Sequence, residues 1–209
     1  MTLHPAAGPT SPLSVVAVVG STHRPAKTAV LVEAILEELA GVLPIEPHVV
    51  RLEEVGPLLG GALYRSQVPE PVEEHLQRIE AAGLLVVATP VYRASFTGLF
   101  KHLFDIVDQY ALVDTPVLLA ATGGSERHGL VIEHQLRPLF AFFQALTLPV
   151  GVYAHDRDFT DYRISSPLLA QRIATAVRRG LPFIDDTSRH EPALDRELCA
   201  AGTAVAAGR

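Results

Sequence analysis

Residues 15–20 read VVAVVG and lead directly into a polar loop, STHRPAKT, at residues 21–28. The apolar run does not alternate with polar side chains, which is typical of a strand that helices cover on both faces. A helical pattern follows at residues 26–40, with Leu31 and Ile35 on its apolar face. A buried strand that passes through a polar loop into an amphipathic helix predicts the first unit of a parallel α/β sheet.

The same alternation of strand and helix continues along the chain. Four more strands are predicted, at residues 48–52, 84–89, 116–122 and 148–154, and four more helices, at residues 71–82, 99–110, 129–145 and 167–179. Residues 53–69 are rich in Gly and Pro and are expected to form an irregular loop. We therefore expect an α/β fold with a doubly wound sheet of five parallel strands.

One domain is expected at residues 14–182, between an N-terminal tail at residues 1–13 and a C-terminal tail at residues 183–209, because the periodicity fades after the last helix. The 209 residues carry a net charge of −6, which argues against nucleic acid or an anionic membrane as the partner. No apolar run approaches the length of a membrane span, and Cys199 is the single cysteine, so a cytoplasmic protein without disulfides is expected.

Ligands of an open parallel sheet bind beyond the carboxyl ends of its strands, which directs attention to three loops. The loop after the first strand carries the hydroxyls of Ser21, Thr22 and Thr28 and the cations Arg24 and Lys27. Together with the free amides at the start of the following helix, these groups suit a phosphate. No G-x-G-x-x-G motif is present, which leaves a dinucleotide-binding Rossmann motif unsupported.

The loops after the third and fourth strands suit a flat, polar ring, because they combine an apolar wall, an aromatic side chain and glycines that let the backbone come close to a ligand. Their candidate residues are Pro90, Val91, Tyr92 and Arg93 in one loop and Thr122, Gly123 and Gly124 in the other. The sequence shows no catalytic triad or paired carboxylates. No metal site is expected, because His128 and His134 are six residues apart and cannot share one face of a helix.

Four motifs occur in order: the loop at residues 20–28, ATPVYR at residues 88–93, LFKHLFD at residues 99–105 and AATGGS at residues 120–125. On these motifs the chain resembles the NADPH-dependent FMN reductase family, and within it the branch that supplies reduced FMN to alkanesulfonate and methanesulfonate monooxygenases. The resemblance implies a flavodoxin-like fold with the strand order 2-1-3-4-5. It also implies NADH or NADPH as the hydride donor.

For the site, the resemblance implies that Ser21, Arg24, Lys27 and Thr28 hold the FMN phosphate. The candidate residues of the other two loops would line the isoalloxazine, and the protein needs no acid or base, because hydride passes directly to the flavin. Many members of the family have Ser where this chain has Ala26, so weak FMN binding is expected. Tyr92 is the only aromatic residue expected near the ring, which favours FMN as an exchanging substrate.

The helix predicted at residues 129–145 contains Pro138, which requires either a kink or a wide π turn. The sulfonate branch has a π-helix here, at a tetramer interface, and His134 occupies the matching position. The resemblance therefore makes His134, with Glu133, Gln135 and Arg137, a candidate subunit contact that governs flavin exchange. An ordinary kinked helix with a solvated histidine is the alternative.

The family also forms dimers through the helix predicted at residues 99–110. Lys101 and Asp105 either form a surface pair on this helix or contact a second subunit, as Phe100 and Phe104 would, in a homodimer or homotetramer.

The leading interpretation is a reductase that supplies FMNH2 to a partner monooxygenase. A quinone or azo reductase that retains FMN, and a flavodoxin-like electron-transfer or binding module, remain alternatives. The choice between NADH and NADPH stays open.

Overall fold

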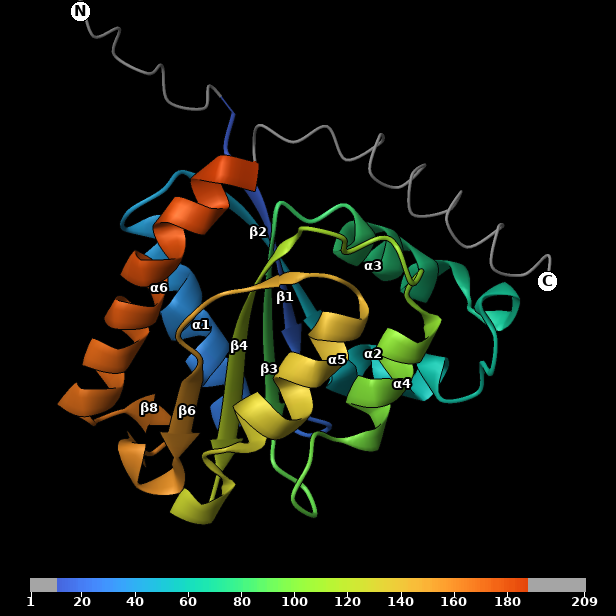
Figure 1. Cartoon of the computed structure of the whole chain (residues 1–209). Helices are drawn as coiled ribbons and strands as arrows, with labels where there is room; N and C mark the ends of the chain where they lie inside the picture. The colour runs from blue at the N-terminus through green and yellow to red at the C-terminus, as the bar shows by residue number, and fades with distance from the viewer. Residues whose placement is uncertain (1–10, 188–209) are drawn as a thin grey trace, which may run out of the picture.

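The computed structural model describes residues 11–187, in which a parallel sheet lies between two layers of helices (Figure 1). The strands run in the order β2-β1-β3-β4-β5, with β6 also paired to β4, which confirms the predicted flavodoxin-like order. Their bounds are β1 Leu13–Val19, β2 Ile45–Arg51, β3 Leu84–Pro90, β4 Pro116–Gly123, β5 Leu146–Thr147 and β6 Val152–His155.

The central strands lack polar alternation because each of their faces is covered. In β1, Val16 and Val18 face one core, while Val15, Ala17 and Val19 face the other. Side chains of α1 (Lys27–Ala40) and α6 (Pro167–Thr187) complete the second core. The first core is completed by α2, α3, α4 and α5, whose bounds are Leu52–Leu59, Glu70–Glu80, Gly98–Ile106 and Arg137–Phe142.

The prediction of an irregular loop at residues 53–69 is wrong. The chain there forms α2 and a short 3₁₀ helix, Arg65–Gln67, before α3 begins. Leu52, Val55 and Leu59 are spaced along one face of α2 and are buried in the core. Burial of this face outweighs the cost of Pro57 inside the helix, where the proline lacks an N–H donor.

The last predicted strand, at residues 148–154, is divided in the structure. Val117 of β4 pairs with Thr147 and Ala120 pairs with Val152, so the last strand holds two residues more than β4 over this stretch. Pro149 and Gly151 lie in the interruption, and a proline cannot donate to a strand ladder. The split therefore follows from the local sequence and shifts the chain that comes after it.

Two helices also end elsewhere than predicted. Helix α4 ends at Ile106, before the predicted end at residue 110, whereas α6 continues to Thr187, past the predicted helix end at residue 179. Phe100 and Phe104 of α4 are buried in the core, so the expectation that they contact a second subunit is wrong. The tail residues 1–10 and 188–209 lie outside the described part of the chain. Among the helices of residues 11–187, none has the length and apolar character to cross a membrane.

A histidine pair on β2 and α3 predicts a pH-dependent stability. Nε2 of His48 lies 2.9 Å from Nδ1 of His75, and burial, followed by the charge of Arg78, lowers the pKa of both rings. An unfolded histidine takes up a proton near about pH 6.5, whereas the folded pair resists protonation until the pH is lower. The free energy of unfolding should therefore fall as the pH is lowered from neutral through the pKa values of the folded pair.

Urea unfolding at a series of pH values measures this effect. The change His75→Gln should reduce the slope between pH 7.5 and 5. An equal slope in wild type and His75→Gln would contradict the assignment.

Candidate functional site

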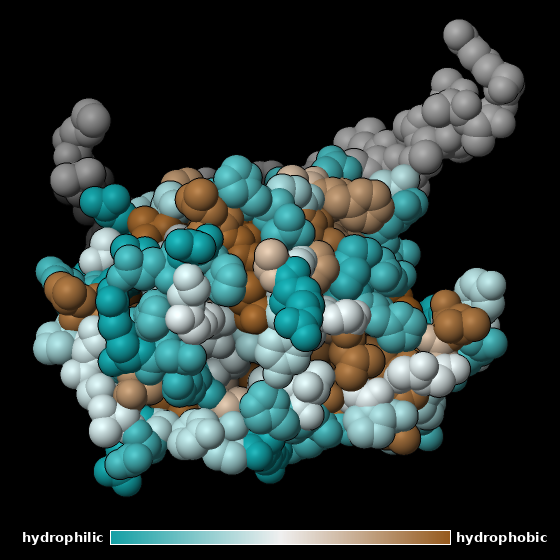
Figure 2. Space-filling view, turned by 90° about the horizontal axis from the view of Figure 1, so that it is seen from below, coloured by the Kyte–Doolittle hydropathy of each residue, from teal (hydrophilic) through white to brown (hydrophobic). Residues whose placement is uncertain are grey.

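The carboxyl ends of β1, β3 and β4 surround a cavity of about 300 Å³. Figure 2 looks onto this edge of the sheet, where hydrophilic residues cover most of the surface and hydrophobic ones show between them. The first loop contributes hydroxyls and an ammonium group to the lining, and two tyrosines also line the cavity. Its residues are Ser21, His23, Pro25, Ala26, Lys27, Thr28, Pro90, Val91, Tyr92, Thr122, Gly123, Gly124, Asp156 and Tyr162.

All but two of the residues predicted to bind FMN meet in this cavity. Arg24 is instead paired with Glu53 and Glu54 of α2 and lines a neighbouring cleft of about 540 Å³. Arg93 is exposed in the turn after β3 and lies outside the lining. The roles of all these residues toward FMN stay predictions, and the geometry supports them least for Arg24 and Arg93.

The sequence reasoning missed Asp156 and Tyr162, which come from the segment after the last strand. A 3₁₀ helix, Asp156–Asp158, and a hairpin of β7 (Phe159–Thr160) and β8 (Arg163–Ile164) bring both side chains to the cavity. The expectation that Tyr92 is the only aromatic residue near the site is therefore wrong. One sequence signal could have pointed to Asp156: it belongs to a polar run, residues 155–158, that directly follows the strand predicted at residues 148–154.

Ser21 has the features expected of a ligand-binding hydroxyl. Its side chain is buried, and among the described residues its Oγ has no hydrogen-bond partner. A buried hydroxyl without a partner costs about 1–3 kcal/mol, so such a group calls for a partner from outside the chain, such as a ligand or an ordered water. Helix α1 begins beside it without a side-chain cap at Ala26, so no capping side chain competes with an anion for the amides at the start of the helix. These observations fit the phosphate of FMN.

Two buried threonines join the start of α1 to the end of β4. Oγ1 of Thr28 lies 2.7 Å from Oγ1 of Thr122, and either hydroxyl can donate to the other. Because each hydroxyl carries one proton and the bond uses only one of them, the second proton remains available for a ligand in the cavity. The pair therefore supplies a donor as well as a tie between the two loops.

Gly123 permits a close approach at the end of β4. A Cβ atom at this position would lie 2.5 Å from the hydroxyl of Tyr153, which donates a hydrogen bond of 2.6 Å to the carbonyl oxygen of Ser125. Burial raises the pKa of Tyr153, so the phenol stays protonated as this donor. The glycine thus allows a fixed stretch of backbone to border the cavity.

A strained turn after β3 carries Tyr92, which lines the cavity. Tyr92 and Ser95 exchange backbone hydrogen bonds of 2.8 and 3.1 Å around Arg93 and Ala94, whose φ angles are 51° and 68°. Two positive φ angles define a turn that favours Asn-Gly, and a side chain in this conformation costs about 1–2 kcal/mol per residue. Strain is therefore held at the edge of the cavity.

Relief of this strain should be measurable. We expect Ala94→Gly to raise the free energy of unfolding by about 0.5–1 kcal/mol, because glycine adopts positive φ without a steric cost and loses part of this gain to chain entropy. The matched change Ala141→Gly, at an exposed position within α5, should lower it by about 1 kcal/mol. Urea unfolding of both variants measures these changes in the free energy of unfolding. Changes of the same sign would contradict the strain at Ala94.

A π turn at Ile132–Leu136 precedes α5, as the resemblance and Pro138 led us to expect. His134 is exposed in this turn. Gln135 accepts a hydrogen bond of 3.0 Å from the hydroxyl of Ser95, which ties the π turn to the strained turn at the cavity.

The neighbours of His134 are thus engaged within the chain. Glu133 and Arg137 form two hydrogen bonds, of 2.6 and 2.9 Å, and the Arg137 guanidinium lowers the pKa of Glu133. The role of His134 in a subunit contact stays a prediction. Within residues 11–187 no group of three His, Cys, Asp or Glu side chains is arranged to hold a metal ion.

Comparison with known proteins agrees with this geometry. Residues 13–160 match the family described as NADPH-dependent FMN reductase. The chain is 61% identical to the NADH-dependent FMN reductase SfnE of Pseudomonas putida, over 83% of this chain and 93% of that protein. It is 55% identical to an FMN reductase (NADPH) of Pseudomonas aeruginosa, over 86% of this chain and 96% of that protein.

The solved apo structure of an NADH:FMN oxidoreductase, EMOB, superposes with a TM-score of 0.72 at 29% identity, covering 81% of this chain and 89% of that one. The residues that match the family model include every residue that lines the cavity except Tyr162. The chain belongs to the NADPH-dependent FMN reductase family and is an NAD(P)H:FMN oxidoreductase that uses FMN and a nicotinamide nucleotide.

Proposed function

We propose that this reductase takes up FMN as an exchanging substrate and releases FMNH2 to a separate monooxygenase of alkanesulfonates or methanesulfonate in the cytoplasm. The observation that carries the proposal is the sparse phosphate end of the cavity. Among the described residues that line it, Lys27 is the only Lys or Arg, and Ala26 supplies no hydroxyl. Few charge-assisted bonds to the phosphate favour release of the flavin.

The residues of the cavity act by position. Bound FMN supplies the ring that accepts hydride from the nicotinamide. Ser21, the two bonded threonines and the first turn of α1 are suited to hold the phosphate, while Val91 and Tyr92 form a wall for the ring. Tyr92 is 43% exposed, so this wall is open toward solvent and leaves room for a nicotinamide to approach.

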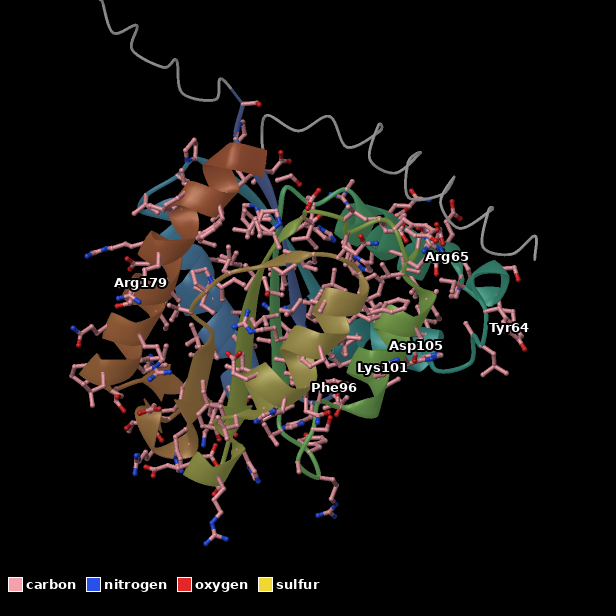
Figure 3. The ribbon with its side chains drawn as sticks, in the orientation of Figure 1. Tyr64, Arg65, Phe96, Lys101, Asp105 and Arg179 are labelled. Carbon is pink, nitrogen blue, oxygen red and sulfur yellow. The ribbon has the colours of Figure 1, made fainter. Side chains whose placement is uncertain are left out.

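A homodimer or homotetramer is part of the proposal. Leu58, Leu63 and Tyr64 are exposed at the end of α2 and in the segment after it, and isolated monomers rarely expose large apolar groups together. Helix α2 packs on α4, where Lys101 and Asp105 form an ion pair on the outward face (Figure 3). Light scattering of wild type and of a His134 deletion tests this assembly, and a monomeric wild type would contradict it.

The central experiment measures nicotinamide oxidation with and without added FMN. We expect a colourless purified protein that oxidises NADH or NADPH only when free FMN is present, and that supports sulfite release when a sulfonate monooxygenase is added. A yellow protein with ping-pong kinetics and a quinone acceptor would instead indicate a reductase that retains FMN. Absence of nicotinamide oxidation would indicate an electron-transfer or binding module.

A further inference from the structure

The cation of the cavity is already paired within the protein. Nζ of Lys27 lies 2.8 Å from Oδ1 of Asp156 and 3.4 Å from the backbone oxygen of the same residue. Both side chains line the cavity, and they are 32% and 54% exposed. The ammonium group that is best placed for the FMN phosphate therefore has a carboxylate bound to it.

The pairing leaves the cavity without a net charge. Among the described residues of the lining, Lys27 is the only Lys or Arg and Asp156 is the only Asp or Glu. The nearest further cation in the first loop, Arg24, is held by two glutamates of α2. A phosphate dianion that enters this cavity meets one cation and one anion, and the anion repels it.

Hydrogen bonds of the neighbouring residues fix the backbone on both sides of Asp156. The carboxylate of Asp158 accepts a hydrogen bond of 2.8 Å from the backbone amide of His155, and Nδ1 of His155 accepts one of 3.1 Å from the amide of Arg157. A Cβ atom at Gly124 would lie 3.0 Å from Oδ2 of Asp156, so the glycine leaves room for the carboxylate. The backbone around Asp156 is thus fixed, and its carboxylate lies between Lys27 of the first loop and Gly124 at the end of β4.

We propose that Asp156 competes with the flavin phosphate for Lys27 and thereby sets how readily FMN leaves. When the phosphate binds, Lys27 must share or break its bond to Asp156, and when the phosphate departs, Asp156 takes the cation back. The carboxylate lowers the affinity for FMN and for FMNH2 alike, because both carry the phosphate. This inference rests on the proposed exchange of flavin and names a residue responsible for it.

The test is the change Asp156→Asn in the full-length protein. We expect the Kd for FMN, measured by flavin fluorescence without nicotinamide, to fall on the order of tenfold, and the dissociation rate to fall with it. The affinity for riboflavin, which has the same ring and no phosphate, should stay unchanged. The salt dependence of FMN binding should become steeper, because Lys27 then faces the phosphate alone.

A charge-matched control is Glu126→Gln, which removes one negative charge from a residue that pairs with Arg157 outside this cavity. It should leave both flavin affinities unchanged. Thermal unfolding of each variant verifies that it folds. An unchanged FMN affinity in Asp156→Asn, or an equal change for riboflavin, would overturn the role of Asp156. A wild-type protein that keeps FMN through purification would overturn the exchange itself.

Discussion

Ser21→Ala is expected to raise the Kd for FMN by about 10- to 100-fold, because a charge-assisted hydrogen bond to a phosphate contributes about 1.5–3 kcal/mol. The same change should leave the free protein at least as stable as wild type. The Ser21 hydroxyl is buried without a partner among the described residues, so its removal relieves a desolvation cost. The affinity for FMN should therefore fall while the free energy of unfolding stays the same or rises, as expected of a hydroxyl that binds a ligand.

Fluorescence titration with FMN and urea unfolding of the free protein measure the two effects. Ser66→Ala, at an exposed position in the 3₁₀ helix after α2, is the matched control and should change neither quantity. A loss of stability with unchanged FMN affinity would show that the Ser21 hydroxyl serves the fold and not the flavin.

The change Gly20→Ala should have the largest effect on stability. A Cβ atom here would lie 2.9 Å from the carbonyl oxygen of Ala88, 2.9 Å from the buried ring of Phe100 and 3.1 Å from Cα of Thr89. Two of these neighbours are backbone atoms of the adjacent strand β3, which cannot avoid the new atom by a change of rotamer. Overpacking of this kind costs about 3 kcal/mol, and the displaced loop should also weaken FMN binding.

The matched control for this variant is Gly98→Ala at the first residue of α4, where an added Cβ meets no atom within 4 Å. Alanine should raise the free energy of unfolding there by up to about 1 kcal/mol, because it is a better helix former and less flexible when unfolded. Equal effects of the two substitutions in urea unfolding would contradict the close packing at Gly20.

The central strands of the sheet could be predicted from the sequence because an apolar run without alternation is a local signal. The run at residues 15–20 shows burial on both faces without knowledge of its neighbours, and the loop that follows it lies at the carboxyl edge by topology alone. Most of the cavity could be predicted in this way. Helix α2 was missed because Gly56 and Pro57 mask the spacing of its apolar residues.

The remaining differences depend on tertiary contacts. Arg24 points away from the cavity because Glu53 and Glu54, on a helix that was not expected, hold it. Asp156 and Tyr162 reach the cavity because a hairpin folds back after the last strand. The spacing of the residues does not predict this hairpin, which depends on tertiary packing.

The two additional residues between β5 and β6 have a consequence for how chain length can vary among related proteins. Val117 pairs with Thr147 of β5 and Ala120 pairs with Val152 of β6, so the two additional residues lie outside the strand ladder. Deletion of both would let β5 run directly into β6 with the pairing of β6 unchanged, and Asp156 would keep its place beside Lys27. The interruption is thus a point where related chains can differ in length without a change at the cavity.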